Sequence, residues 1–77
     1  MPEKLASADA ARVTAIRSFL EDRLESAVRA RLASETAVVR HTRRNDSGRT
    51  ARALGRISYW SHVEDGIRWM LKTIGSP

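Results

Sequence analysis

Arginine is the residue type in this chain whose number and spacing most clearly indicate a chemical role. Residues 40–56 hold six arginines and a single acidic residue, Asp46. This segment alone accounts for the formal net charge of +5, because the rest of the chain has eight basic and eight acidic residues. Guanidinium groups match phosphate and carboxylate oxygens in pairs. The candidate binding residues are Arg40, Arg43, Arg44, Arg49, Arg52 and Arg56.

Two kinds of partner fit these arginines, and a third reading needs no partner. DNA or RNA would be held through its phosphates, with an affinity that falls as salt rises. An acidic protein would be attracted by the same charge. A solvated charged segment that binds nothing is the alternative. Binding to a membrane surface ranks last, because only Leu54 and Ile57 supply large apolar side chains among the arginines.

Residues suited to catalysis or metal binding are few. His62 and Asp65 share a helical face, but a zinc site needs three or four ligands and the chain has no cysteine. The four glycines are scattered, so no phosphate-binding loop is present. We therefore expect no cofactor, no metal and no enzymatic activity.

Trp69 is a candidate interface anchor, with His62 beside it on the polar side of a helix. Tryptophan is enriched at binding hot spots. The alternative is that Trp69 packs against the rest of the chain, since tryptophan is usually largely buried.

The overall composition predicts one small helical domain over residues 1–77. Neither a signal peptide nor an apolar stretch of membrane-spanning length is evident, so we expect a cytoplasmic protein with no membrane partner. A chain of this size buries only about 60% of the surface that its unfolded form exposes. Such chains usually depend on close helix packing or on self-association.

Apolar residues at steps of three and four predict two long amphipathic helices. The first spans 7–33, with Ser7 as its N-cap. The second runs from Arg49 or Ala51 to Ile74 and stops at Gly75. Asn-Asp-Ser-Gly at 45–48 predicts the turn between them, with glycine accepting a positive φ. The apolar stripes are Val13, Ile16, Leu20, Leu24, Ala27 and Val28, then Trp60, Val63, Ile67, Met70, Leu71 and Ile74.

Two parts of this pattern stay open. Residues 34–44 could continue the first helix or form a short middle helix, and a strand over 36–40 is the minor alternative. On a helical wheel of 100° per residue, Arg49, Arg52 and Arg56 fall in line with the apolar face of the second helix. Either the helix breaks near Gly55, or its first turns extend beyond the core. Both outcomes leave these arginines exposed.

The predicted fold is all-α, a helical hairpin. One hairpin cannot cover both of its apolar stripes, so we expect a homodimer that forms a four-helix bundle. A three-helix monomer is the competing architecture. A helix-turn-helix reading of Ala51 and Gly55 fails, because Ser61 occupies the position that needs an apolar residue.

The functional hypothesis is a small basic helical protein that contacts nucleic acid through residues 40–56, in a regulatory or accessory role. The alternative is a protein–protein interaction module that docks on an acidic partner. Such a module would be an adaptor, an inhibitor or a phage-type accessory protein. The sequence contains no motif specific enough to name a family.

Overall fold

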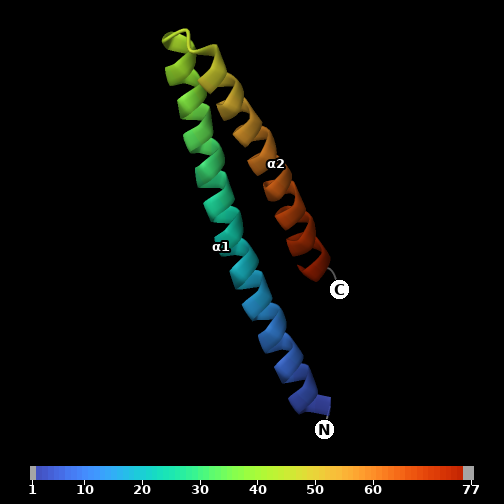
Figure 1. Cartoon of the computed structure of the whole chain (residues 1–77). Helices are drawn as coiled ribbons and strands as arrows, with labels where there is room; N and C mark the ends of the chain where they lie inside the picture. Colours follow the sequence, from blue (N-terminus) through green and yellow to red (C-terminus); the bar gives the residue numbers. More distant parts are fainter. Residues whose placement is uncertain (1, 76–77) are drawn as a thin grey trace.

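The chain folds into two antiparallel helices joined by a tight turn (Figure 1). A computed structural model describes the backbone of residues 2–75 and the side chains of residues 9–74. Helix α1 spans Pro2–Arg43 and helix α2 spans Ser47–Gly75. The result is a rod whose Cα atoms extend over 66 × 15 × 13 Å. The predicted all-α hairpin is confirmed.

Helix α1 is longer at both ends than the sequence pattern predicted. It begins at Pro2, so Ser7 lies inside the helix and the prediction of an N-cap there is wrong. Proline is tolerated in the first turn, where its missing N–H has no helical partner to lose. Residues 34–43 continue the same helix, because no glycine or proline interrupts residues 3–43. The separate middle helix and the strand are therefore absent from this described segment.

The turn is made by a helix C-cap that leads directly into a helix N-cap. The Asp46 N–H donates to the His41 carbonyl at 2.9 Å, and the Asn45 N–H donates to the Thr42 carbonyl at 3.0 Å. This is the Schellman pattern, and Asn45 supplies its left-handed residue with a φ of 56°. Asp46 Oδ1 then accepts the Arg49 N–H at 3.1 Å and caps α2. Asparagine, rather than the predicted Gly48, takes the positive φ, and Gly48 lies inside α2.

The two helices meet along a seam, by which we mean their inward-facing positions. These positions recur at alternating steps of three and four residues, the 3.5-residue repeat of a coiled coil. Each side chain on the seam is buried or half-buried. The seam consists of Leu20, Leu24, Ala27, Arg31, Ser34, Val38 and His41 on α1, and Thr50, Ala53, Ile57, Trp60, Glu64, Ile67, Leu71 and Ile74 on α2.

On the helical wheel of 100° per residue, arginines of the second helix fell in line with its apolar face. The 3.5-residue repeat removes this conflict. Helix α2 runs unbroken through Gly55, so the predicted break is wrong. At 3.5 residues per turn, Ala53 and Ile57 face α1, while Arg49 and Arg56 fall on the flank of the seam. Ala51 and Gly55 lie within one continuous helix, which also rules out a helix-turn-helix at this position.

The apolar core is small. Only four apolar side chains among the described residues are buried: Leu20, Ala27, Ala53 and Ile67. Two of the four are alanines, and small seam residues let the helix axes approach closely. No described helix is long and apolar enough to cross a lipid bilayer.

Candidate nucleic-acid interface

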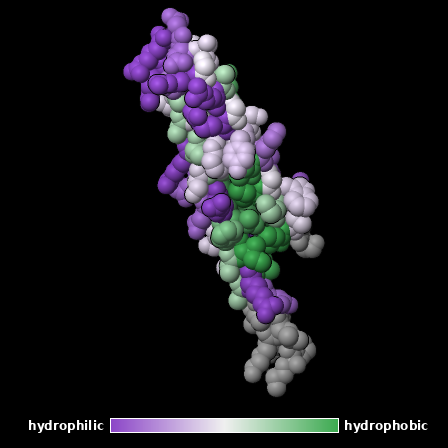
Figure 2. Space-filling view, in the orientation of Figure 1, coloured by the Kyte–Doolittle hydropathy of each residue, from purple (hydrophilic) through white to green (hydrophobic). Residues whose placement is uncertain are grey.

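The six predicted arginines lie at the turn end of the hairpin. They occupy the last turns of α1, the turn itself and the first turns of α2, and every one is exposed. Hydrophilic residues gather at this end in Figure 2, in the same view as Figure 1. We call this group the basic tip. It consists of Arg40, Arg43, Arg44, Arg49, Arg52 and Arg56.

The chain's own carboxylates leave most of the basic tip unneutralised. Arg49 Nε lies 3.5 Å from Asp46 Oδ2, and both side chains are largely solvent-accessible. Exposed pairs of this kind contribute little to stability. Within the described residues, the other five arginines form no ion pair. Their charges therefore remain available to an outside anion.

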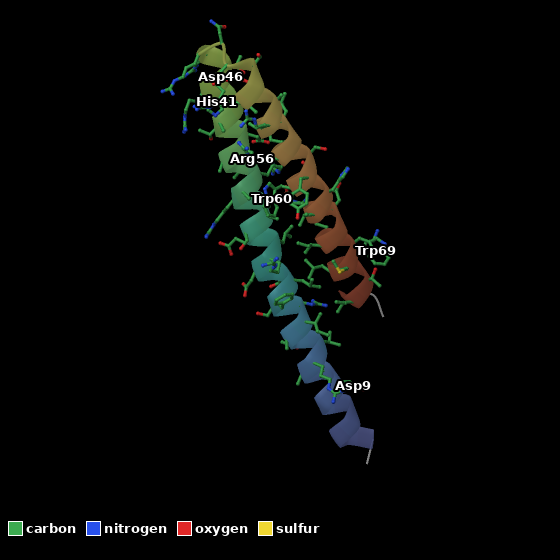
Figure 3. All side chains as sticks on the ribbon, viewed as in Figure 1. Asp9, His41, Asp46, Arg56, Trp60 and Trp69 are labelled. Carbon is green, nitrogen blue, oxygen red and sulfur yellow. The ribbon has the colours of Figure 1, made fainter. Side chains whose placement is uncertain are left out.

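Three of these arginines share a hollow with a histidine. Arg49, Arg52 and Arg56 follow one flank of α2 at steps of three and four, and His41 faces them from the seam of α1. The four residues line a hollow of about 300 Å³, which we call the basic notch. His41 and Arg56 are labelled at this end in Figure 3. The His41 Nδ1 is buried and has no hydrogen-bond partner among the described residues.

The remaining three arginines belong to the last turns of α1. Arg40, Arg43 and Arg44 line a second hollow together with Thr36 and Val39. Cations are favoured at this position, because the helix dipole places partial negative charge at a C-terminus. The fold thus divides the predicted site into two groups of three that sit side by side across the turn.

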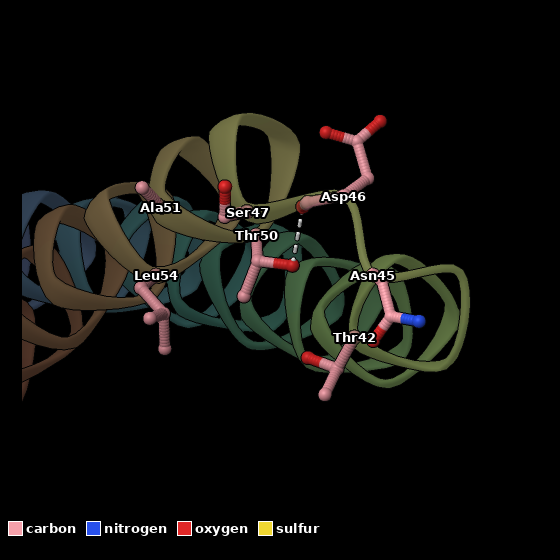
Figure 4. A pocket seen from close by; sticks show the side chains of 7 residues that line it. All are labelled: Thr42, Asn45, Asp46, Ser47, Thr50, Ala51 and Leu54. Atoms are coloured by element: carbon pink, nitrogen blue, oxygen red, sulfur yellow. Dashed lines mark hydrogen bonds between the residues drawn. The ribbon is translucent and has the colours of Figure 1, made fainter.

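The opposite flank of the turn carries no arginine. A hollow of about 380 Å³ lies there, and its seven lining residues are mostly small and include no base (Figure 4). The Thr50 hydroxyl donates to the Asp46 carbonyl at 2.8 Å and fixes the start of α2 beside it. The sequence analysis did not anticipate this hollow. Its lining residues are Thr42, Asn45, Asp46, Ser47, Thr50, Ala51 and Leu54.

The structure does not bring the proposed interface anchor to the arginines. Trp69 lies near the far end of α2 and points away from α1 (Figure 3). Its side chain is 67% exposed, so it does not pack against the rest of the chain. His62, two helical turns earlier, is exposed on the same line. Among the described residues, His62 and Asp65 belong to no group of three or more potential metal ligands.

A buried carboxylate in the middle of the seam was missed by the sequence analysis. Glu64 is only 2% exposed, and its two oxygens accept hydrogen bonds from Arg31 Nε at 2.5 Å and Arg68 Nη2 at 3.2 Å. Arg31 also donates to Glu35 at 2.8 Å. These bonds, first to Glu64 and then to Glu35, raise the pKa of Arg31 above its usual value. A search for a 3.5-residue repeat would have placed Arg31 and Glu64 on the seam.

The comparisons with known proteins add no assignment to this geometry. No protein-family model, curated protein or solved structure matches the chain.

Proposed function

We propose that this protein binds nucleic acid, DNA or RNA, through the phosphates, with the basic tip as the contact surface. The observation that carries the proposal is the set of five exposed arginines that lack an ion pair within the described residues. They sit at one end of a rigid hairpin, whereas the rest of the chain is electrically balanced. Concentrated positive charge of this kind releases counterions from a nucleic acid on binding.

The basic notch offers a place for one phosphate group. Its three guanidinium groups can each present two parallel N–H donors to phosphate oxygens. The notch would therefore fix the register of a backbone phosphate, while Arg40, Arg43 and Arg44 hold neighbouring phosphates by charge.

The width of the tip argues against the reading of base sequence. Across its long axis the whole rod measures 15 × 13 Å at its Cα atoms, before side chains are added. The major groove of duplex DNA is about 12 Å wide and accommodates a single helix. The pair of helices would thus rest on the backbone instead of entering the groove, so we propose binding that is independent of sequence and a regulatory or accessory role without catalysis.

We further propose that two chains pair as a homodimer, so that helices from both share one core. The chain exposes 6070 Å², against about 4,700 Å² for a compact monomer of its 8.6 kDa mass. The excess, about 1,400 Å², exceeds the ~800 Å² that each partner buries in a standard interface. A dimer with two basic tips would hold a nucleic acid more tightly than one tip alone when the nucleic acid is long enough to reach both tips.

Salt-dependent binding to a 20-bp duplex of arbitrary sequence tests the nucleic-acid proposal. Four phosphates per tip, one in the notch and one at each of Arg40, Arg43 and Arg44, predict a slope of log K against log salt of about −3.6, at roughly 0.9 per contact. Arg43→Gln with Arg44→Gln is expected to reduce that slope by about 1.8. The matched control, Arg12→Gln with Arg29→Gln, removes the same charge from exposed sites outside the tip and leaves the slope nearly unchanged. The proposal fails if no binding occurs at low salt, or if both variants lose affinity equally.

A second candidate function rests on the exposed tryptophan. Trp69 and His62 present an aromatic and a polar group on the outer face of α2, away from both α1 and the tip. This surface fits an adaptor or inhibitor that docks on an acidic partner protein, with the arginines speeding the encounter. A complex that survives nuclease treatment and is lost in Trp69→Ala, but not in Tyr59→Ala, would favour this role over nucleic-acid binding.

A further inference from the structure

Helix α1 extends well beyond the end of α2. Arg31 lies opposite Glu64, and α2 continues for eleven residues to Gly75, so in antiparallel register it ends opposite Leu20. The N-terminal part of α1 therefore has no α2 beside it, as Figure 1 shows. We call residues 2–19 the overhang. Every described side chain within it, from residue 9 to residue 19, is exposed.

The apolar stripe of α1 continues into the overhang, where no other described part of the chain covers it. Val13 stands one heptad before Leu20 and so lies in line with the seam, and Ile16 flanks it. Phe19 is 62% exposed at the point where the overhang meets the hairpin. Across the seam, Met70 is exposed while Leu71 is only half-buried. Figure 2 shows hydrophobic residues gathered on this half of the molecule, away from the hydrophilic turn end.

We infer that this apolar surface is covered by a second copy of the same chain, in an antiparallel arrangement centred on the open ends of the two hairpins. The overhang of each copy then lies along the apolar residues at the open end of the other. The inference rests on the chain pairing proposed above and adds the surface and the orientation. It does not depend on nucleic-acid binding.

The distribution of charge favours a second copy of this chain as the partner on the apolar surface. It also favours an antiparallel orientation of the two copies. Residues 9–25 interleave four carboxylates with three arginines, so two copies can approach here without a field of like charge. Each basic tip carries six arginines against Asp46 alone. A parallel pair would place two such tips within about two Debye lengths of each other, where their repulsion is poorly screened. The antiparallel pair keeps them at opposite ends of the assembly.

This arrangement predicts the distances between equivalent residues of the two copies. For each overhang to reach the other hairpin, the two-fold axis must pass near Leu20, where the overhang meets the hairpin. Residue 18 of the two copies would then lie within about 20 Å, given helices packed 8–10 Å apart. The two turns, 25 residues from Leu20, would be about 75 Å apart at 1.5 Å per residue.

Single-cysteine labelling tests this arrangement, because the chain contains no cysteine. Energy transfer between donor- and acceptor-labelled copies is measured for Ser18→Cys and for Ser47→Cys, both exposed in the single chain. High transfer at position 18 with low transfer at position 47 is expected. Full side-by-side antiparallel overlap would bring the turns to about 40 Å. A dimer with that spacing, or with adjacent turns, overturns this inference and leaves the pairing itself standing.

Two matched double variants test the surface. Ile16→Glu with Phe19→Glu is expected to raise the dimer dissociation constant by about 100-fold or more. Leu32→Glu with Val39→Glu places the same charges on equally exposed apolar sites of α1 outside the overhang. Sedimentation equilibrium on both, with helicity checked by circular dichroism, gives the comparison. Equal weakening of the two variants, or a monomeric wild type at about 100 µM, would overturn the inference.

Discussion

The turn end and the open end of the hairpin differ in what they bury and in what they expose. At the turn end the seam is narrow, with Ala53 and His41 facing inward and unpaired arginines outside. At the open end the seam residues are large, including Leu20 and Ile67, yet the apolar surface around them is only partly covered. At the turn end the seam is covered by the two helices, and exposed arginines surround it. At the open end the charges are nearly balanced, and part of the apolar surface stays exposed to solvent.

Under the two proposals, this difference keeps the nucleic-acid contact and the contact between chains apart on one short rod. A hydrophobic surface next to the arginines would have to bury charge in order to associate, which is costly. Separation along the rod avoids that cost. Between the two ends lies the network of Arg31, Arg68, Glu64 and Glu35, in which two guanidinium groups are paired with two carboxylates.

The largest effect is expected from overfilling the turn end. Ala53 is 0% exposed and lies close to His41 across the seam, so Ala53→Leu must force the helices apart near the turn. Overpacking of this kind costs about 1–3 kcal/mol of unfolding free energy. Urea denaturation measures it, with the exposed Ala51→Leu as the control, for which the change should stay within about 0.5 kcal/mol. If Ala53→Leu matched the wild type, the close approach of the helices would be refuted.

A smaller effect is expected at the boundary between the two ends. Glu64→Leu leaves Arg31 without its main carboxylate and should lower the thermal midpoint by about 4–8 °C. The double variant Arg31→Leu with Glu64→Leu should recover the wild-type midpoint or exceed it, because a buried ion pair rarely outperforms apolar packing. Differential scanning calorimetry at one protein concentration measures the thermal midpoints of the single and the double variant. A double variant less stable than the single one would mean that the network contributes net stability.

The smallest effect concerns the single carboxylate in the basic tip. Asn caps a helix about as well as Asp, so Asp46→Asn should keep the cap on α2 and leave the thermal midpoint nearly unchanged. The same change frees Arg49 from its ion pair. Affinity for a duplex at 0.1 M salt should rise by up to about 8-fold, the value of one added phosphate contact. Asp22→Asn, exposed and remote from the tip, is the control, and equal gains in both variants would refute a local role for Asp46.

Local features of the sequence were enough to predict the two helices, the turn and the position of the charge. Each depends on neighbours a few residues away: helix-forming residues, the Asn-Asp pair, and six arginines in one segment. The helix limits were less well predicted. Ser7 can cap a helix, but nothing before it stops one, so α1 continued to Pro2.

The sequence by itself determined a basic helical hairpin, and the tertiary structure decided which side chains face inward. Burial depends on the partner helix, and antiparallel pairing imposed a 3.5-residue repeat that a single-helix wheel does not contain. That repeat buried Glu64 and moved Arg56 to the flank of the seam. The unequal lengths of the helices then left the overhang uncovered, because α2 ends opposite Leu20. The spacing of the sequence contains this repeat, but only the register of α2 against α1 decides which residues meet and where the overhang begins. That register is set by pairs such as Arg31 and Glu64, which lie 33 positions apart.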